Sequence, residues 1–323
     1  MTLQPSTSGP SSQRTSAADV SVVLCTFNRA TLLVDALRAL VAQDDAPPYE
    51  VVVVDNNSTD GTRGVVETFA ASGLVRYVRE PAQGLSYARN HGVATASADI
   101  VAFTDDDVRV EPTWIRSLVR AFAEHPDVDM IGGRVEPDWQ AEPPPWLRQA
   151  GHAPLALVDY GAAPLRIGPD APRCLIGANV AIRRRALERL HGFSPRLQRV
   201  ADGIGSTEDH HFQTRLLETG GAALYDPRIV ARAIVPGERL SKRYHRAWHQ
   251  GHGRFYALMR DPLFERSRAP VFGVPAHVYR SAVGEASAWA VSLLRGRPSA
   301  AFAHELKLRF LAAFARQRIF QRT

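Results

Sequence analysis

The chain has 323 residues, of which 45% are hydrophobic and 22% charged, values that are typical of a globular protein with a sizeable core. Its formal charge is +6, and the excess lies after residue 227, where 18 Lys and Arg stand against 5 Asp and Glu. Such a basic region favours a polyanionic partner, either nucleic acid or an anionic membrane surface. No apolar run approaches the roughly 18 residues of a membrane-spanning helix, which excludes that class.

Two features point to the compartment. Residues 1–19 are rich in Ser, Thr and Pro and have almost no large apolar side chains, so we predict a disordered tail. This tail lacks a continuous apolar segment, which argues against a secretory signal. The only two cysteines, Cys25 and Cys174, indicate a reducing compartment without a disulfide framework. We therefore expect a cytoplasmic protein.

Residues 20–103 alternate between strand and helix patterns. Apolar runs rich in β-branched residues predict strands, and apolar residues at helical spacing predict helices, in the order strand 20–27, helix 28–43, strand 49–54, helix 63–73, strand 75–80, helix 84–97 and strand 99–103. This alternation predicts an α/β fold with a mostly parallel central sheet and helices on both faces. The nearly unbroken apolar strands fit such burial.

Polar loops follow three of these strands. They comprise Thr26 to Arg29, Asp55 to Asp60, and Asp105 to Asp107. Ligands of open α/β sheets bind at the carboxyl ends of the strands, so these loops are expected to converge on one crevice. Each loop could instead be a simple turn, since Asp60-Gly61 is a common turn pair. All three being turns alone is the weaker interpretation.

The segment IVAFTDDDVRV, residues 100–110, runs from an apolar strand into three carboxylates. In extended backbone Asp105 and Asp107 point the same way and Asp106 points opposite. Two hard oxygen ligands on one side suit Mg²⁺ or Mn²⁺, whereas a solvated acidic loop is the alternative. No GxxxxGK[ST] loop is present and no GxGxxG follows the first strand, which disfavours P-loop NTPases and Rossmann dehydrogenases.

A second dense cluster, STEDHHFQTRLLETGG, covers residues 206–221. It predicts a helix that starts at Ser206 and stops at Gly220-Gly221. Ser206 and Asp209 could form a capping box. Alternatively, Glu208 and Asp209 face the crevice at the positive end of the helix dipole, where an ionised carboxylate can act as a general base.

Five segments, in order, resemble a family 2 glycosyltransferase of the GT-A fold. They are VSVVLCTFNRATLL, VVVVDNNSTDGT, GLSYARNHGVATASADIVAFTDDDV, CLIGANVAIRRRAL and GSTEDHHFQTRLLETG, within about residues 20–245. The resemblance implies inverting, metal-dependent transfer of a sugar from a nucleotide-diphosphate donor to a hydroxyl of a glycan, a lipid-linked glycan or a small molecule. The implied cofactor is Mg²⁺ or Mn²⁺.

The resemblance also implies roles for individual residues. Asp209 would be the catalytic base, and Asp105 and Asp107 would bind the metal with the diphosphate. The nucleotide would be held by the residues that match the remaining family positions, namely Thr26, Phe27, Asn28, Asp55, Asn56, Arg89 and Asp106.

Two positions depart from the family pattern. Phe27 stands where many relatives have Tyr, which keeps a ring but removes a hydroxyl. Ala233 stands where many have a metal-contacting His, before the Pro-x-x-Arg-Leu-like segment at 236–240. His245, His249 or His252 could substitute, but an ordinary basic helix is the favoured interpretation. This departure also leaves room for a catalytically silent nucleotide-sugar-binding domain, and a nucleotidyltransferase of similar fold is a further alternative.

We expect three parts: the tail 1–19, a catalytic domain 20–240 and a basic helical extension 241–323. In the extension, Phe302, Leu306, Phe310 and Phe314 recur on one helix face. Such a stripe either packs inside the protein or, with its basic neighbours, lies on an anionic membrane, and we predict peripheral membrane association. No nucleic-acid recognition motif is present, so no nucleic-acid partner is expected. Near the acceptor entrance, Trp139 and Trp146 could stack on a sugar or cover the core.

Overall fold

A computed structural model describes residues 18–168, 173–198, 200, 203–261, 264–265 and 270–320. Nearly all of the predicted tail 1–19 lies outside the described residues. The first half of the chain follows the predicted alternation, with the elements β1 (Val20–Thr26), α1 (Ala30–Val41), β2 (Tyr49–Asp55), α2 (Thr62–Ala70), β3 (Val75–Arg79), α3 (Leu85–Thr95) and β4 (Ile100–Asp105).

The second half adds shorter strands and the C-terminal helices. These elements are β5 (Val108–Val110), α4 (Trp114–Glu124), β6 (Met130–Trp139), α5 (Leu147–Ala150), η1 (Ala153–Leu155), β7 (Leu165–Ile167), β8 (Val180–Arg183), α6 (Arg184–Arg189), η2 (Pro195–Leu197), α7 (Glu208–Glu218), β9 (Ala223–Val235), η3 (Gly237–Leu240), α8 (Lys242–Met259), β10 (Pro270–Val271), β11 (Val274–Pro275), α9 (Ala276–Leu294) and α10 (Pro298–Phe320).

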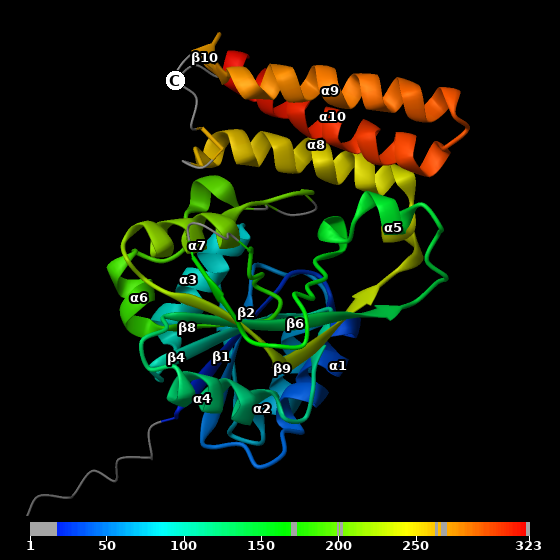
Figure 1. The fold of residues 1–323 in the computed structure, drawn as a ribbon. Coiled ribbons are helices and arrows are strands. Elements are labelled where there is room, and N and C mark those ends of the chain that lie inside the picture. Colours follow the sequence, from blue (N-terminus) through cyan, green and yellow to red (C-terminus); the bar gives the residue numbers. More distant parts are fainter. Residues whose placement is uncertain are drawn as a thin grey trace, which may run out of the picture.

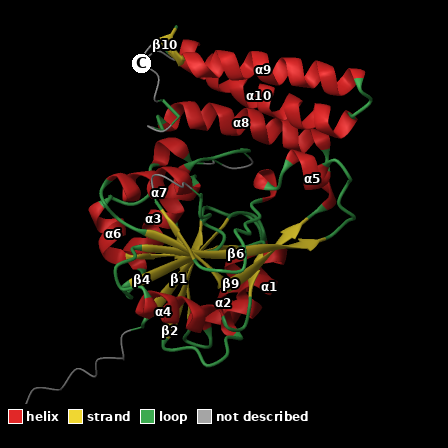
Figure 2. Cartoon of the chain, viewed as in Figure 1, coloured by secondary structure: helices red, strands yellow, loops and turns green. Residues whose placement is uncertain are grey.

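One mixed sheet forms the centre of the molecule (Figure 2). Its strand order is β3-β2-β1-β4-β8-β6-β9-β5, with β7 also paired to β9. The pairs among β1 to β4 are parallel, whereas β8 is antiparallel to both β4 and β6. Helices α1, α2 and α4 lie on one side of the sheet and α3, α6 and α7 on the other (Figure 1). The predicted mostly parallel sheet with helices on both faces is confirmed.

The strands are apolar because both faces of the sheet are covered. Val51 to Val54 of β2 are all fully buried, and β1 and β4 are buried along most of their length. Each fully buried valine contributes about 1.5–3 kcal/mol relative to an exposed one. This core fixes the ends of β1, β2 and β4 and therefore the loops that follow them.

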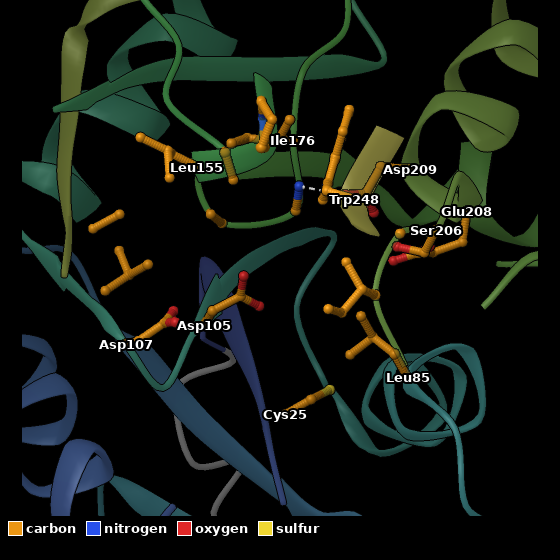
Figure 3. A pocket seen from close by; sticks show the side chains of 18 of the residues that line it. Cys25, Leu85, Asp105, Asp107, Leu155, Ile176, Ser206, Glu208, Asp209 and Trp248 are labelled. Atoms are coloured by element: carbon orange, nitrogen blue, oxygen red, sulfur yellow. Dashed lines mark hydrogen bonds between the residues drawn. The ribbon is translucent and has the colours of Figure 1, made fainter. Parts of the chain in front are cut away.

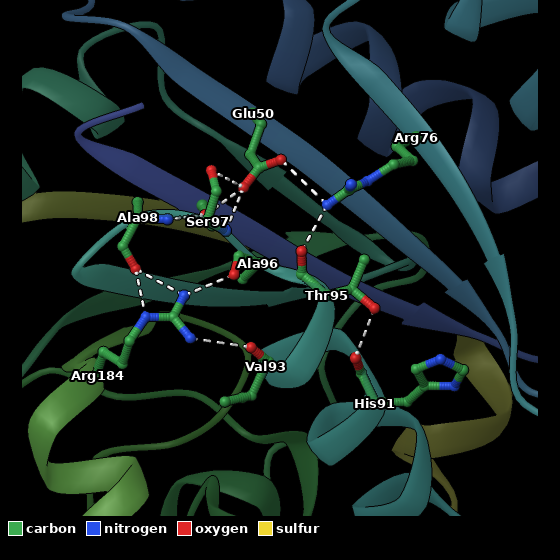
Figure 4. A network of polar contacts seen from close by, with 10 residues as sticks. Glu50, Arg76, His91, Val93, Thr95, Ala96, Ser97, Ala98 and Arg184 are labelled. Carbon is green, nitrogen blue, oxygen red and sulfur yellow. Dashed lines mark hydrogen bonds and ion pairs between the residues drawn. The ribbon is translucent and has the colours of Figure 1, made fainter. Parts of the chain in front are cut away.

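A polar network connects the amino ends of β1, β2 and β4, which lie opposite to the strand ends that carry these loops (Figure 4). Glu50 accepts hydrogen bonds from Ser21 Oγ at 2.6 Å and from Ser97 N at 2.6 Å. The Arg184 guanidinium donates to the carbonyl oxygens of Ala96 and Ala98, at 2.7 and 2.8 Å, just beyond the end of α3. Because a cationic side chain satisfies these carbonyls, the end of α3 is held at the amino ends of the strands.

Helices α8, α9 and α10 stack in a layer next to the carboxyl end of the sheet (Figure 1). Helix α10 packs on both α8 and α9. Its stripe is inside this layer, since Phe302, Leu306 and Phe314 are at most 3% exposed and Phe310 is half-buried. The stripe therefore packs inside the protein, which is one of the two roles considered for it, and the peripheral membrane association of this region stays a prediction.

Two roles were open for Trp139 and Trp146, contact with a sugar or cover of the core. Trp139 and Trp146 pack against a small apolar cluster, and Trp146 meets Phe302 edge to face at 4.9 Å between ring centroids. They therefore cover the core, the second of the two roles considered.

Among the helices of the described residues, none combines the length and apolar character that crossing a membrane requires.

Candidate active site

A cavity of about 800 Å³ opens where β1 and β4 end. It is bordered by those strand ends, by the start of α7 and by one face of α8 (Figure 3). Its volume is in the range of small-molecule sites. Asp105, Asp107 and Asp209 all border it, although about 100 residues of chain separate the first two from the third. The convergence expected from the strand ends is thus found.

The acidic motif sits on the turn between β4 and β5. Asp105 ends β4, residues 106 and 107 form a turn, and Figure 3 shows Asp105 and Asp107 directed into the cavity. Asp106 is 4% exposed and accepts hydrogen bonds from Thr26 Oγ1 at 2.8 Å and Arg29 Nη1 at 2.9 Å. Burial raises the pKa of Asp106 to about 6, against the lowering effect of Arg29.

Asp106 does not simply point opposite to its neighbours. Arg29 Nη1 also contacts Asp107 Oδ2 at 3.3 Å, so one guanidinium holds both carboxylates. The expectation of opposite directions assumed extended backbone, whereas the chain turns at this point. Asp107 Oδ2 is further paired with Arg239 at 2.9 Å, which brings a positive charge from the segment after β9.

The loops assigned to the nucleotide are tied to one another. Thr26, Phe27 and Asn56 border the cavity. Asn56 holds the following loop, donating to Ala82 O at 2.7 Å and accepting from Gly84 N at 2.7 Å. The structure therefore places these three side chains where a ligand in the cavity can reach them or the loops they hold.

Asn28 and Asp55 are not among the residues that border the cavity in the described part of the chain. Asn28 Oδ1 accepts from Thr59 N at 2.7 Å, which joins the loops after β1 and β2. Asp55 is buried and accepts from Tyr77 Oη at 2.8 Å and from Ser58 N at 2.8 Å. Both residues hold the loops after β1 and β2 in place, and their contact with a nucleotide stays a prediction.

Arg89 connects the two acidic groups. Its guanidinium is paired with Asp209, with Glu208 Oε1 at 3.1 Å and, at 3.9 Å, with Asp105 Oδ1. The residue is 3% exposed. Burial opposes its charge, but the carboxylates of Asp209, Glu208 and Asp105 raise the pKa of Arg89 above its ordinary value. Its predicted contact with the nucleotide stays a prediction, because the structure shows it bonded to carboxylates.

The start of α7 presents two carboxylates in different surroundings. Glu208 is 2% exposed, and burial, followed by the charge of Asp209, raises its pKa. Asp209 is 22% exposed at its side chain and accepts a hydrogen bond from Gly177 N at 2.8 Å. The helix starts at Glu208 and has no side-chain cap bond at Thr207, so the predicted capping box of Ser206 and Asp209 is absent. Both carboxylates border the cavity, and Asp209 is the more exposed of the pair.

Other groups that border the cavity are poorer bases or nucleophiles. Burial raises the pKa of Cys25 to about 12 and raises that of Cys174 as well, so neither thiol is ionised at neutral pH. Nucleophilic thiolate chemistry is therefore disfavoured, and an oxygen base such as Asp209 remains.

The donor set suits a divalent cation that is held jointly with a diphosphate. Ala233 of β9 pairs with Val108, and Ile234 N donates to Asp107 O at 2.9 Å, so the position of the missing His lies next to Asp107. In the described residues no three His, Cys, Asp or Glu side chains are grouped to hold a metal. Mg²⁺ commonly uses one or two carboxylates and takes its remaining ligands from phosphates and water. Asp105 and Asp107 fit that pattern.

Several residues of the site were not identified from the sequence. The sequence places Arg239 in a Pro-x-x-Arg-Leu-like segment and Arg29 at the end of a loop, without a role for either. Trp248, His252 and Tyr256 of α8 also border the cavity. They lie in a region interpreted as an ordinary basic helix, and only His252 among them is considered above, as a substitute for the missing metal ligand. The helix itself is confirmed, and the burial of His245 within it fits that interpretation.

Known proteins resemble this chain in sequence. Residues 21–191 match the family described as Glycosyl transferase family 2. The chain is 27% identical over 210 residues to a glucosyl-dolichyl phosphate glucuronosyltransferase of Haloferax volcanii, covering 64% of this chain and 66% of that protein. It is 40% identical over 107 residues to a validoxylamine A glucosyltransferase of Streptomyces hygroscopicus subsp. limoneus, covering 32% of this chain and 24% of that protein. The matches thus span two thirds or less of these relatives.

Solved structures share the fold. One is a mannosyltransferase from Pyrobaculum calidifontis in complex with GDP-Man and Mn²⁺, which matches with a TM-score of 0.60 at 24% identity. The match covers 96% of this chain and 89% of the mannosyltransferase chain. TarS 1–349 from S. aureus, in complex with UDP, has a TM-score of 0.54 at 18% identity and covers 92% of this chain and 90% of its own. The GT-A fold is confirmed, and with more than half of its residues matching, the chain belongs to glycosyl transferase family 2.

Proposed function

We propose that the protein transfers a sugar from a nucleotide-diphosphate donor to a hydroxyl of an acceptor, with inversion at the sugar carbon. The acceptor is a glycan, a lipid-linked glycan or a small molecule. One observation carries this proposal: Asp105 and Asp107 border the same cavity as Asp209, and Arg89 contacts both groups. A diphosphate bound at Asp105 and Asp107 would therefore place its sugar near Asp209.

The donor half of the site is assigned to the strand ends. Asp105 and Asp107 would hold a divalent cation, Mg²⁺ or Mn²⁺, together with the diphosphate. When bound, such a cation offsets the negative charge that collects on the leaving diphosphate. Thr26, Phe27 and Asn56 border the space left for the nucleoside. The fold relatives that bind GDP-Man with Mn²⁺, or UDP, support a nucleotide in this half.

Asp209 is assigned as the base. One of its oxygens takes the proton of the acceptor hydroxyl as the acceptor oxygen forms a bond to the anomeric carbon. The bond from that carbon to the diphosphate breaks, and the nucleoside diphosphate leaves with the electron pair. Gly177 N and Arg89 hold the carboxylate by hydrogen bonds, and its remaining lone pairs can accept the proton. A single in-line attack needs one base.

Two alternatives are weaker. A catalytically silent nucleotide-sugar-binding domain is conceivable because Ala233 replaces a metal ligand, but it leaves the orientation of Asp209 toward the cavity without a purpose. A nucleotidyltransferase would favour a glycine-rich basic loop after the first strand, whereas the loop after β1 is Phe27-Asn28-Arg29.

The proposal is tested by screening nucleotide sugars. Uridine, guanosine, adenosine and thymidine diphosphate sugars are added with Mn²⁺ or Mg²⁺, and unfolding temperature and nucleoside diphosphate release are measured. We expect one donor to stabilise the protein, by about 2.7 kcal/mol at one hundred times its Kd, and to be hydrolysed slowly. EDTA and Asp107→Asn should each reduce both effects.

Asp45→Asn is the matched control, because this side chain is 88% exposed on a distant loop, and it should behave like wild type. If no nucleotide sugar changes the unfolding temperature with either metal, the proposed function is wrong. Binding without any turnover would favour the silent domain.

A further inference from the structure

One wall of the cavity has no part in the roles assigned above. Helix α8 contributes Trp248, His252 and Tyr256 to this wall. Figure 3 shows Trp248 and Asp209 on one side of the cavity and Asp105 and Asp107 on the other. A donor anchored at Asp105 and Asp107 therefore leaves the α8 side for the second substrate.

Main-chain packing fixes this wall relative to the base. A Cβ at Gly251 would lie 2.1 Å from Ile204 O, so α8 touches the segment that leads into α7 backbone to backbone. The partner segment has Gly205 at a φ of +85°, which favours glycine. His210, the residue after Asp209, packs against Tyr256 with 5.4 Å between ring centroids and an interplanar angle of 53°. The distance between the α8 wall and Asp209 is therefore set by rigid contacts.

The wall is aromatic. The Trp248 and His252 rings stack at 4.4 Å with an interplanar angle of 18°, and His252 lies 5.7 Å from the Tyr256 ring. Because His252 supports one face of Trp248 and the indole is only partly buried, part of the indole remains accessible from the cavity. An aromatic surface that combines apolar faces with polar edges suits a ligand that has both kinds of surface.

The ring side chains of this wall favour their neutral forms. Burial lowers the pKa of His252 to about 4 and lowers that of His210, while burial raises the pKa of Tyr256. The arginines that border the cavity in the described part of the chain are each paired with carboxylates, namely Arg29, Arg89 and Arg239. A phosphate or carboxylate placed against α8 would be desolvated without a cation to pair with, which is costly.

We propose that the α8 face is the acceptor subsite and that it binds an uncharged sugar ring on Trp248, with one ring hydroxyl directed at Asp209. The inference rests on the proposed function and adds to it the chemical class of the acceptor. Trp248 is then a specificity-determining residue that contacts the acceptor and not the nucleotide.

The test uses the full chain with the donor found in the screen. Acceptors are methyl hexopyranosides and methyl N-acetylhexosaminides, which lack an aromatic group of their own, compared with methyl glucuronides and hexose 1-phosphates. Transfer is followed by mass spectrometry of the product, and nucleotide Kd by calorimetry. We expect transfer to at least one neutral glycoside, with kcat/KM at least tenfold above that of any anionic acceptor.

Substitutions at position 248 locate the subsite. Trp248→Ala should raise the acceptor KM at least tenfold and leave the nucleotide Kd within twofold, which also shows that the variant is folded. Trp248→Phe should keep the acceptor KM within about threefold of wild type. Trp289→Ala is the matched control, because Trp289 is 39% exposed on α9, and it should leave every parameter unchanged.

Other results would overturn the inference. An acceptor KM within twofold of wild type in Trp248→Ala, or a loss confined to nucleotide affinity, would remove Trp248 from the acceptor subsite. A preference for anionic acceptors, or donor hydrolysis without transfer to any neutral glycoside, would contradict the acceptor class while leaving the donor half intact. Absence of any donor would defeat the proposed function itself, and the subsite with it.

Discussion

At the scale of residues, the site depends on one buried guanidinium. Arg89 is buried, is paired with Glu208 and Asp209, and lies 3.9 Å from Asp105. Without Arg89, the buried Glu208 would lie beside the charge of Asp209 and lack the guanidinium that offsets it. Burial already raises the pKa of Glu208. The arginine thus keeps two adjacent carboxylates together at the start of α7.

Arg89→Met should therefore be strongly destabilising. Removing one partner of a buried ion pair leaves uncompensated charge and costs about 3–5 kcal/mol. Urea denaturation measures the change. Arg63→Met is the control, since the Arg63 side chain is 71% exposed and its ion pair with Glu67 lies on the surface, so its loss should cost below about 1 kcal/mol. Equal, small losses in both variants would show that Arg89 has no structural role of this kind.

A second feature at this scale is the position beside Asp107 that Ala233 occupies. Ala233 cannot bind a metal, whereas Arg239 contacts Asp107 at 2.9 Å from the segment that follows β9. A positive charge thus lies near the place where the diphosphate is proposed to bind. A diphosphate there would meet Arg239 as well as the cation, so this arginine would offset part of the negative charge of the diphosphate.

At the scale of elements, α10 is held to α8 by both apolar and ionic contacts. The stripe on α10 packs into the layer, and Glu305 accepts hydrogen bonds from Arg246 Nε at 2.7 Å and Nη2 at 2.9 Å. These contacts, first with Arg246 and then with Arg309, lower the pKa of Glu305 to about 2. The same residues that suggested a membrane helix serve helix packing, because their partners come from another element.

Glu305→Gln should reduce stability in a pH-dependent way. The ordinary pKa is 4.5 and the folded one about 2, so the unfolded chain binds more protons between these values. The stabilisation is present above pH 4.5 and is lost as the pH falls toward 2. Because Arg246 is 38% exposed at its side chain, we expect a loss of only about 1 kcal/mol at pH 7.

Denaturant unfolding of both proteins between pH 3 and 8 measures this difference. Glu67→Gln, on a residue that is 56% exposed, is the control and should change stability by a few tenths of a kcal/mol at most. A difference between wild type and Glu305→Gln that grows as the pH falls would contradict the sign of the effect.

At the scale of the whole molecule, the parallel half of the sheet could be predicted from sequence. Strands β1 to β4 and helices α1 to α3 each carry a complete local pattern, and parallel connections are regular. The other half could not. Strand β9 pairs with β5, β6 and β7, whose residues lie about 55 to 125 positions away from their partners in the chain, so no local pattern records the pairing.

The site, like the fold, has one part that could be predicted from the sequence and one part that could not. Acidic residues at strand ends could be predicted to converge, because the ends of parallel strands share one edge of the sheet. The contact of Arg239 with Asp107 spans 132 residues, and the α8 wall depends on how the C-terminal helices dock. Neither follows from local periodicity. Trp139 and Trp146 show the converse, since composition allowed a sugar contact and packing against the core decided otherwise.

The central claim is that one cavity holds two carboxylate groups with separate tasks, and a paired measurement on two variants tests it most directly. With the donor from the screen, nucleotide Kd and transfer rate are measured for Asp209→Asn and Asp107→Asn. We expect Asp209→Asn to keep Kd within twofold and to lose at least about 100-fold in transfer, while Asp107→Asn weakens Mn²⁺-dependent nucleotide binding at least tenfold. Wild-type transfer by Asp209→Asn, or nucleotide binding by Asp107→Asn that equals wild type, would contradict the account.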